Sequence, residues 1–206
     1  MFKIVKSEPS FFKSAKAKIK KPKVSSAWNS SEIEGIRLKL REHILLEEQN
    51  LLCAYCEKQL DSSPKNSNID HFRLKAGHLF PEKTLNYDNL LVSCNTSSRC
   101  SRHKDKHIKS KNDYDNIVNP ITENPDDFFG YLITGKIIAI NNTSKAEFTI
   151  KIFQLGQASL NRQRQDIAKT LKNITNLSLD EVCDILGNQF CSFIKVVYPK
   201  IKGEEL

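Results

Sequence analysis

Two pairs of cysteines constrain the fold of this 206-residue chain more than any other feature. Cys53 and Cys56 form a C-x2-C pair, and Cys94 and Cys100 form a more widely spaced pair about 40 residues later. Four thiolates satisfy the tetrahedral coordination of Zn2+, and a site closed by four cysteines leaves no position for water or substrate. The sequence therefore predicts a structural zinc site that ties two distant segments together.

The other two cysteines and the hydropathy of the chain bear on its environment. Cys183 and Cys191 lie among large apolar residues, where cysteine behaves as a small hydrophobe, so we expect them in the core. The first 20 residues lack the apolar run of a secretory signal, and no apolar stretch approaches the roughly 18 residues of a membrane span. The pattern predicts a cytoplasmic protein without a membrane-spanning segment, in which closely spaced cysteines bind metal.

Positive charge is concentrated in two segments of the chain. The formal net charge is +8, and residues 1–25 carry eight lysines against one glutamate. Residues 99–111 carry two arginines and four lysines against one aspartate. Clustered cations neutralise phosphates and release counterions, so both segments predict a nucleic-acid partner, with DNA expected ahead of RNA. For residues 13–23 the alternative is a solvated basic tail.

Patterning divides the chain into three parts. In residues 1–30, lysine, serine and proline surround Phe11, Phe12 and Trp28, so we expect a basic arm with little regular structure that docks through these aromatics. Residues 31–115 open with a capping-box pattern, Ser31-x-x-Glu34, and apolar residues at helical spacing then predict a helix to about residue 50. The cysteine-containing segment follows this helix.

Residues 116–206 are expected to combine a short β-hairpin with helices. Two β-branched runs, 137–140 and 148–153, predict the hairpin near residues 137–153. Leu160, Ile167, Leu171 and Ile174 then share one helical stripe, and a second capping box at Ser178 predicts a helix that Pro199 ends. The fold class predicted for the chain is therefore α+β and mainly helical.

Chemistry-bearing residues are concentrated between the two cysteine pairs. Asp70 and His71 end an apolar-polar run, and Asn89 precedes a second run that leads to Cys94. Imidazole has an unperturbed pKa of about 6.5, so His71 is a candidate base for deprotonating water near pH 7. Asp70 offers the hard oxygen ligand that Mg2+ or Mn2+ prefers. These two residues therefore supply a candidate base and a candidate metal ligand.

The order of these parts resembles the HNH nucleases: a cysteine pair, an Asp-His strand end, an Asn-Leu pair, and a second cysteine pair that opens a lysine-rich helix. This resemblance implies a ββα-metal core and endonuclease activity. It further implies that Asn89 holds the loop so that His71 faces the scissile phosphate, and that a hydrogen bond to the ring fixes its tautomer.

One position departs from the pattern of the HNH family. Members place the second ligand of the catalytic metal, His or Asn, directly after the last cysteine, where this chain has Ser101. His103 and His107 follow, and residues four apart share a helix face. We expect His103 to bind the metal with Asp70, with His107 or a water-mediated Ser101 as alternatives, and with both histidines on an exposed basic face as a further alternative.

Five cations near this segment are expected to contact phosphates without reading sequence. They are Arg73, Lys75, Arg99, Arg102 and Lys104.

The resemblance narrows to the PtuB-type HNH nucleases of Septu systems. It rests on residues 48–57, 70–73 and 87–91, and extends to the stretch from 128 to 137 with Leu160 and Arg164 beyond it. It implies an effector nuclease of bacterial anti-phage defence with an ABC/SMC-like, PtuA-like ATPase partner. In some systems a retron reverse transcriptase with its DNA-RNA would be a further partner. The alternative is a catalytically inactive zinc-stapled nucleic-acid-binding module or an assembly subunit of an ATPase complex.

Overall fold

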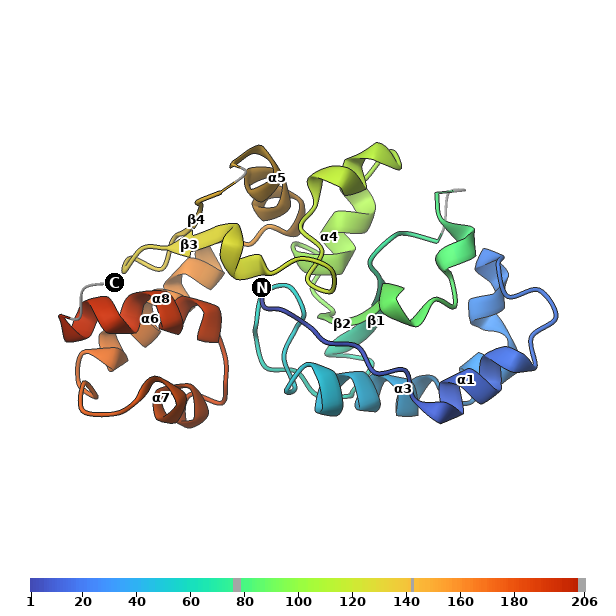
Figure 1. Ribbon diagram of the computed structural model, residues 1–206, viewed down its shortest axis with the longest axis horizontal. Coiled ribbons are helices and arrows are strands. Elements are labelled where there is room, and N and C mark those ends of the chain that lie inside the picture. The colour runs from blue at the N-terminus through green and yellow to red at the C-terminus, as the bar shows by residue number, and fades with distance from the viewer. Residues whose placement is uncertain (76–78, 142, 204–206) are drawn as a thin grey trace.

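The computed structural model describes residues 1–75, 79–141 and 143–203 (Figure 1). These residues form an α+β fold in which most regular structure is helical and two small antiparallel sheets pair β1 with β2 and β3 with β4. The α-helices are α1 (Ser10–Ala17), α2 (Ser31–Glu34), α3 (Arg37–His43), α4 (Cys100–His107), α5 (Thr143–Phe153), α6 (Ala158–Leu171), α7 (Leu179–Ile185) and α8 (Cys191–Lys202). The strands are β1 (Ser67–His71), β2 (Leu90–Cys94), β3 (Phe129–Tyr131) and β4 (Ile137–Ala139).

Short turns of other helical types link these elements. The π-helical turn is η2 (Ile44–Glu48), and the 3-10 turns are η1 (Ser25–Asn29), η3 (Pro81–Lys83), η4 (Tyr87–Asn89), η5 (Asn112–Asn116) and η6 (Pro125–Asp127). Figure 1 shows α1, α3, β1, β2 and α4 in one half of an elongated molecule, and α6, α7 and α8 in the other half. No described helix is both long enough and apolar enough to cross a membrane.

The sheet of β1 and β2 places the chemistry-bearing residues. Its antiparallel register runs from Ser67 opposite Cys94 to His71 opposite Leu90, so Asp70 and His71 lie at the C-terminal end of β1, where the connection to β2 begins. Every residue of β2 is buried, which explains why its sequence reads as a nearly continuous apolar run. Helix α4 follows β2 after a short loop and contacts it. The cysteine pairs and the Asp-His pair thus belong to one strand-strand-helix unit.

The N-terminal arm carries regular structure, so the expectation of an extended, unstructured arm is wrong. Helix α1 forms because Phe12 and Ala15 lie on one face and are buried, which supplies packing that an isolated lysine-rich segment lacks. The expected aromatic docking is confirmed, because Phe12 and Trp28 are both buried. The first residue is tied down as well, since the α-amino group of Met1 pairs with Glu57.

The long helix expected from Ser31 is divided into α2, α3 and η2. Ser30 occupies the N-cap of α2 without a side-chain cap hydrogen bond, so the predicted capping box at Ser31 does not form. The apolar stripe itself is confirmed, because Ile33, Leu40 and Ile44 are fully buried. Tertiary packing, more than capping, holds this segment in place.

The sequence predicted a hairpin near residues 137–153. Its first run does form a strand, but the predicted strand partner is wrong. Strand β4 pairs with β3, and the second β-branched run, 148–153, lies in α5. Ala146, Thr149 and Phe153 are buried at helical spacing, so burial on one helix face overrides the β preference of this run. Gly135 closes the true hairpin with φ +83°, and a Cβ there would lie 2.1 Å from the Asn161 carbonyl oxygen.

The C-terminal helices confirm one boundary and correct another. The capping box of Ser178 and Glu181 forms and begins α7 as predicted. The helix does not continue to Pro199, because residues with positive φ, among them Gly187 and Phe190, separate α7 from α8. Pro199 lies inside α8, which continues to Lys202. Cys183 is buried and Cys191 is half-buried against the same core, as expected.

Replacing Gly135 by alanine is predicted to destabilise the protein by about 3 kcal/mol, because the left-handed backbone and a clash with the Asn161 carbonyl add. Gly203→Ala is the matched control, since Gly203 has φ +78° and, apart from its neighbours along the chain, no described residue lies within 4 Å of the position that a Cβ would take. The control should lose only about 1 kcal/mol. Urea unfolding of the metal-loaded protein measures both, and equal losses would contradict the close approach of α6 to this turn.

Candidate functional site

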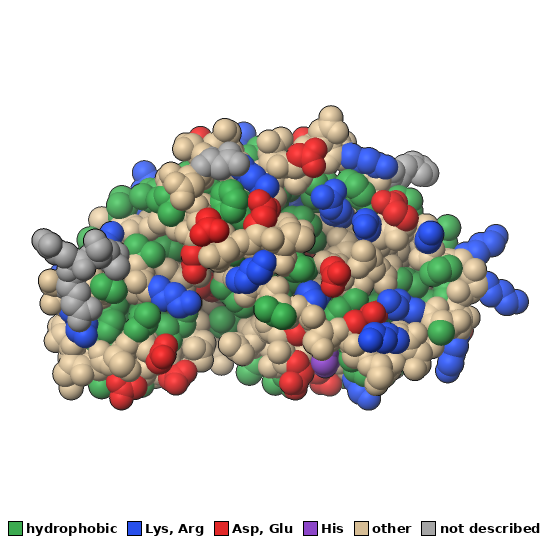
Figure 2. Space-filling model, in the orientation of Figure 1, with side chains coloured by type: hydrophobic (Ala, Val, Ile, Leu, Met, Phe, Trp, Pro, Cys, Tyr) green, Lys and Arg blue, Asp and Glu red, His purple; other side chains and the backbone are tan. Residues whose placement is uncertain are grey.

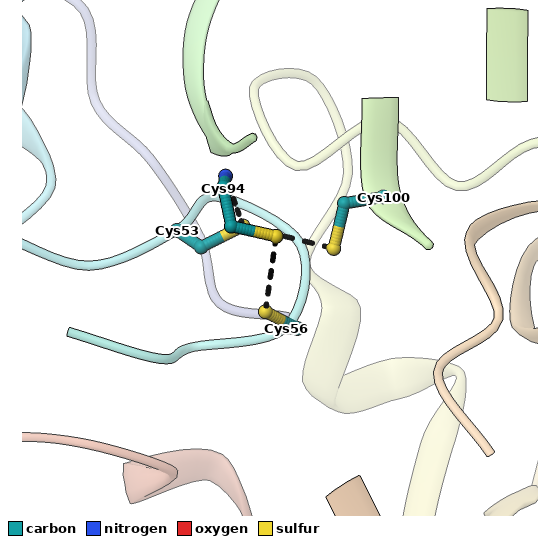
Figure 3. Close-up of side chains that lie close together, drawn as sticks. All are labelled: Cys53, Cys56, Cys94 and Cys100. Atoms are coloured by element: carbon teal, nitrogen blue, oxygen red, sulfur yellow. Dashed lines mark hydrogen bonds between the residues drawn. The ribbon is translucent and has the colours of Figure 1, made fainter. Parts of the chain in front are cut away.

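The four cysteines of the two pairs converge on one buried point (Figure 3). All four Sγ atoms lie within 4.8 Å of one another, with 3.8 Å between Cys53 and Cys100 and 4.0 Å between Cys56 and Cys94. A tetrahedral ion with Zn–S bonds of about 2.3 Å separates its sulfurs by about 3.8 Å, whereas a disulfide needs about 2.05 Å. The cluster therefore fits a metal such as zinc, and its donors fill a tetrahedral shell.

Two groups beside the cluster favour negative charge on the cysteine sulfurs. The backbone N–H of Cys94 donates to the Cys53 sulfur at 3.3 Å. Burial lowers the pKa of Arg99, but the thiolates of Cys56, Cys94 and Cys100 outweigh burial and raise it. Arg99 thus offsets part of the negative charge that four thiolates leave around a divalent ion. Its guanidinium also donates to Gln157 at 3.2 Å, and its expected contact with phosphate stays a prediction.

His71 is held in one tautomer at the end of β1. Its Nε2 lies 3.0 Å from the carbonyl oxygen of Thr84, and a carbonyl only accepts, so Nε2 carries the proton and Nδ1 keeps a lone pair. The Trp28 ring makes a T-shaped contact with the His71 ring, with 4.6 Å between centroids. Burial lowers the pKa of His71 to about 4, against the opposing effects of Thr84 and Asp70. The imidazole is therefore neutral near pH 7 and can accept a proton at Nδ1.

Asn89 ties together the two ends of the loop that follows His71. Its Oδ1 accepts from the Arg73 backbone N–H at 2.7 Å, and its Nδ2 donates to the carbonyls of Arg73 and Lys83 at 3.0 and 3.1 Å. The carbonyl of Thr84 that holds His71 comes directly after Lys83. This is the arrangement that loop-holding by Asn89 requires, and the sequence resemblance had assigned it to this residue.

Asp70 is buried and both of its carboxylate oxygens are engaged. The Tyr55 hydroxyl donates to Oδ2, and the Lys104 ammonium lies 3.2 Å from Oδ1. Lys104 is fully buried, and it also donates to the carbonyls of His71 and Phe72, both at 2.8 Å. The expectation that Lys104 contacts phosphate is therefore wrong.

The charge of Lys104 is maintained despite its burial. Burial lowers its pKa, but Asp70 and Asp105 outweigh burial and raise it to about 12. The same surroundings affect Asp105, whose pKa is raised to about 6 by burial and by Asp70, against the pull of Lys104. A permanent cation thus occupies the space beside the carboxylate that was expected to bind a divalent ion.

The histidines expected to complete that ion's ligands face another element. His103 Nδ1 lies 2.8 Å from the Ile152 carbonyl of α5, and His107 Nδ1 lies 2.8 Å from the His103 carbonyl. Their rings stack at 3.9 Å, which confirms that they share a helix face. Ser101 is buried on the other face, where its hydroxyl exchanges hydrogen bonds with the Asn68 amide at 3.3 and 3.4 Å.

A catalytic Mg2+ or Mn2+ does not fit these donors as they are arranged. Within the described part of the chain, the four cysteines form the only group of three or more closely spaced His, Cys, Asp or Glu ligands. Asp70, His103 and His107 are not brought together. Mg2+ prefers a near-octahedral oxygen shell, and here one engaged carboxylate faces an ammonium group instead.

Cations do border the His71 site. The Arg73 guanidinium lies over the rings of Phe80 and Tyr114 at 5.0 and 5.7 Å, and Lys75 is half-buried two residues further on. The pKa of Lys75 is lowered by burial and by Arg37. Arg102, on α4, is exposed, and its Nε donates to Asn95 Oδ1 at 2.6 Å. Of the five cations expected to contact phosphate, Arg73 and Lys75 are therefore the two that follow His71 within a few residues of the chain.

The folded arm adds a basic groove that the sequence pattern did not locate. Lys13, Lys16 and Lys23 line a groove of about 490 Å3 together with Glu82, Leu85 and Asn86. Figure 2 shows blue side chains gathered at the end of the molecule that the arm forms. Leu85 directly follows Thr84, whose carbonyl holds His71, so the groove and the His71 site share one stretch of chain.

The arm also joins the two halves of the molecule. The α-amino group of Met1 pairs with Glu57, and the Met1 carbonyl accepts from Ser192 at 3.1 Å, so the first residue connects the cysteine turn to α8. From there the chain runs toward α1 (Figure 1), and further along the arm the Trp28 ring makes its T-shaped contact with the His71 ring. The basic groove is therefore fixed relative to the His71 ring.

Two functional contacts were not foreseen from the sequence. Tyr55 lies between Cys53 and Cys56 and reaches Asp70, which is distant in sequence. The Gln49 side chain bonds the Leu52 carbonyl and both backbone groups of Val92 at 2.7 to 2.9 Å, fixing the first cysteine pair against β2. A tyrosine or a glutamine carries no spacing signal of its own, so only the register of β1 and β2 reveals these partners.

The sequence of this chain is similar to those of two proteins named Septu protein PtuB. No family model matches the chain. It is 33% identical over 116 residues to Septu protein PtuB of Bacillus thuringiensis, covering 55% of this chain and 40% of that protein. It is 25% identical over 156 residues to Septu protein PtuB of Bacillus mycoides (strain KBAB4), covering 64% and 52%. The chain spans about half the length of the curated relatives it matches, and the similarity supports a Septu-type relation.

Zinc binding is tested by Cys94→Ser, which should lose about one equivalent of zinc and unfold more easily, because three thiolates no longer close the tetrahedron. Cys183→Ser is the matched control, since Cys183 is a buried thiol outside the cluster and should keep its zinc. Metal analysis of the purified variants measures both. Equal zinc content in the two variants would refute the ligand assignment.

Proposed function

We propose that this chain is an HNH-type endonuclease that hydrolyses phosphodiester bonds of nucleic acid. The observation that carries the proposal is His71, whose Nε2 is tied to the Thr84 carbonyl and whose Nδ1 lone pair is left to act as a base. The strand-strand-helix unit that holds it is closed by four cysteines, and the Asn89 side chain fixes the adjoining loop. These features match the order of parts that the sequence shares with HNH nucleases.

In the proposed reaction, His71 Nδ1 takes a proton from a water molecule as the water oxygen attacks phosphorus. The bond from phosphorus to the leaving oxygen breaks, and that oxygen gains a proton from solvent. General-base catalysis of this kind contributes about 10²- to 10⁴-fold to a rate. Arg73 and Lys75 are placed to offset charge on the phosphate oxygens.

The proposed biological role is that of the nuclease in a bacterial anti-phage system. It is supported by the similarity to proteins named Septu protein PtuB, and by the basic groove of Lys13, Lys16 and Lys23. We extend to this chain the partners that the resemblance implies: an ABC/SMC-like, PtuA-like ATPase and, in some systems, a retron reverse transcriptase with its DNA-RNA. DNA is the proposed substrate ahead of RNA.

One observation favours a second candidate function. The engaged carboxylate of Asp70 and the buried Lys104 suit a structural role as well as a catalytic one. The second candidate is a zinc-bound nucleic-acid-binding or assembly subunit in which cleavage does not occur. The two candidates differ in a single outcome, which is whether any nucleic acid is cut.

Nuclease activity is tested by His71→Ala, which should cut at least about 10²-fold more slowly because the base is lost. Plasmid, single-stranded DNA and RNA are each incubated with Mg2+, Mn2+ or EDTA, with and without the ATPase partner. His43→Ala is the matched control, because the His43 ring contacts the Ser7 carbonyl and the rings of Phe11 and Tyr87, whereas the His71 ring is held by the Thr84 carbonyl. If wild type and His71→Ala are indistinguishable under every condition, the second candidate stands.

Nucleic-acid binding by the groove is tested by the triple variant of Lys13, Lys16 and Lys23 to glutamine. Binding should weaken, and the slope of log K against log salt should fall by about 0.9 for each phosphate of duplex DNA that is no longer neutralised. A matched triple variant replaces Lys151, Lys169 and Lys172, which are exposed on α5 and in and just after α6. A salt dependence unchanged by the groove variant would mark the arm as a protein-docking element.

A further inference from the structure

We propose that Tyr55 and Lys104 clamp the Asp70 carboxylate, so that the four-cysteine metal site sets the position of the Asp70-His71 strand end. This inference deepens the proposed nuclease function and relies on it for the catalytic consequence. Tyr55 and Lys104 are positioning residues in this scheme, because they act through Asp70 and His71 and not on substrate.

Tyr55 is one side of the clamp. It lies between the two ligands of the C-x2-C pair, and its ring is fully buried and stacked on Phe153 at 4.1 Å. Its hydroxyl donates to Asp70 Oδ2. Packing against Phe153 needs only a ring, which phenylalanine would also supply. The hydroxyl is therefore accounted for by the carboxylate, since a buried hydroxyl without a partner costs stability.

The backbone around Tyr55 is fixed by the metal ligands and by β2. Cys53 N–H donates to the Lys58 carbonyl at 2.8 Å, and Glu57 N–H donates to the Cys53 carbonyl at 3.1 Å. Ala54 N–H donates to the Val92 carbonyl at 3.0 Å. The tyrosine hydroxyl is thus delivered to Asp70 from a turn with a cysteine of the cluster on each side, and a metal held by those cysteines would fix the shape of that turn.

Lys104 is the other side of the clamp. It lies one helical turn after Cys100, the cysteine of the cluster that begins α4. The position of the Lys104 backbone is therefore also set by the cluster. The ammonium contacts Asp70 Oδ1 at 3.2 Å and grips the His71 and Phe72 carbonyls at 2.8 Å. Both oxygens of Asp70 are therefore held by residues that neighbour metal ligands, and the backbone of the proposed base is held with them.

The clamp is tested in the metal-loaded full chain with Tyr55→Phe, which removes only the hydroxyl. The variant should keep its zinc, because every ligand is retained. It should lower the midpoint of urea unfolding in the wild-type background but not in an Asp70→Leu background, where the hydroxyl has no partner to lose. Equal shifts in both backgrounds overturn the clamp, whether or not the protein is a nuclease.

A matched control and a second measurement cover variants that fold poorly. Tyr198→Phe deletes another buried hydroxyl, one that donates to the Ile174 and Leu177 carbonyls at 2.7 and 2.8 Å in the C-terminal half. Hydrogen exchange at the backbone amides of His71 and Phe72 should be at least tenfold faster in Tyr55→Phe and unchanged in Tyr198→Phe. Unchanged exchange in Tyr55→Phe overturns the clamp without any substitution at Asp70.

Kinetics then separate the clamp from the proposed function. With the nucleic acid that the wild type cuts, Tyr55→Phe should lower kcat at least tenfold and leave KM within twofold, because the groups that bind substrate are intact. Tyr198→Phe should change neither. A change in KM alone overturns the positioning role. If the wild type cuts nothing, the proposed function fails while the unfolding and exchange measurements still decide the clamp.

Discussion

The interaction on which the rest of the structure depends is the convergence of four buried thiolates. It joins the turn after η2, the end of β2 and the start of α4, which are otherwise linked by a two-stranded sheet and short loops. A structural zinc ion contributes about 10–16 kcal/mol of apparent binding free energy, against a total stability of about 5–15 kcal/mol for a typical domain. Without a metal, four thiolates this close would repel one another, so we infer that folding of this unit is coupled to metal binding.

A buried ion pair fixes the geometry of the strand end that lies next to the cysteine cluster. Asp70 and Lys104 form an ion pair with side chains almost fully excluded from solvent, and such pairs persist only when hydrogen bonds satisfy the remaining groups. Tyr55 and the His71 and Phe72 carbonyls supply those bonds. The arrangement makes a firm support for the strand end, and it also explains why the carboxylate is not an open ligand for a second metal ion.

Local spacing along the chain was enough to predict part of the fold. The cysteine pairs, the buried stripe beginning at Ile33, and the capping box at Ser178 follow from residue types a few positions apart, and the structure contains all three. Tertiary structure decided what local spacing cannot express. Residues 148–153 form part of a helix because one face of α5 is buried. Helix α8 continues through Pro199, and Val197 and Tyr198, which precede this proline, are buried.

The same division holds within the candidate site. The sequence by itself determined the candidate residues Asp70, His71 and Asn89, because their types and order carry the pattern. Lys104 and His103 are adjacent in sequence, but successive helix residues point about 100° apart, so one faces β1 and the other faces α5. Which face of α4 meets β1 is set by the cysteine cluster, whose other members are far away in the chain. Only the tertiary structure therefore decided that a buried lysine, and not a histidine, stands beside the carboxylate.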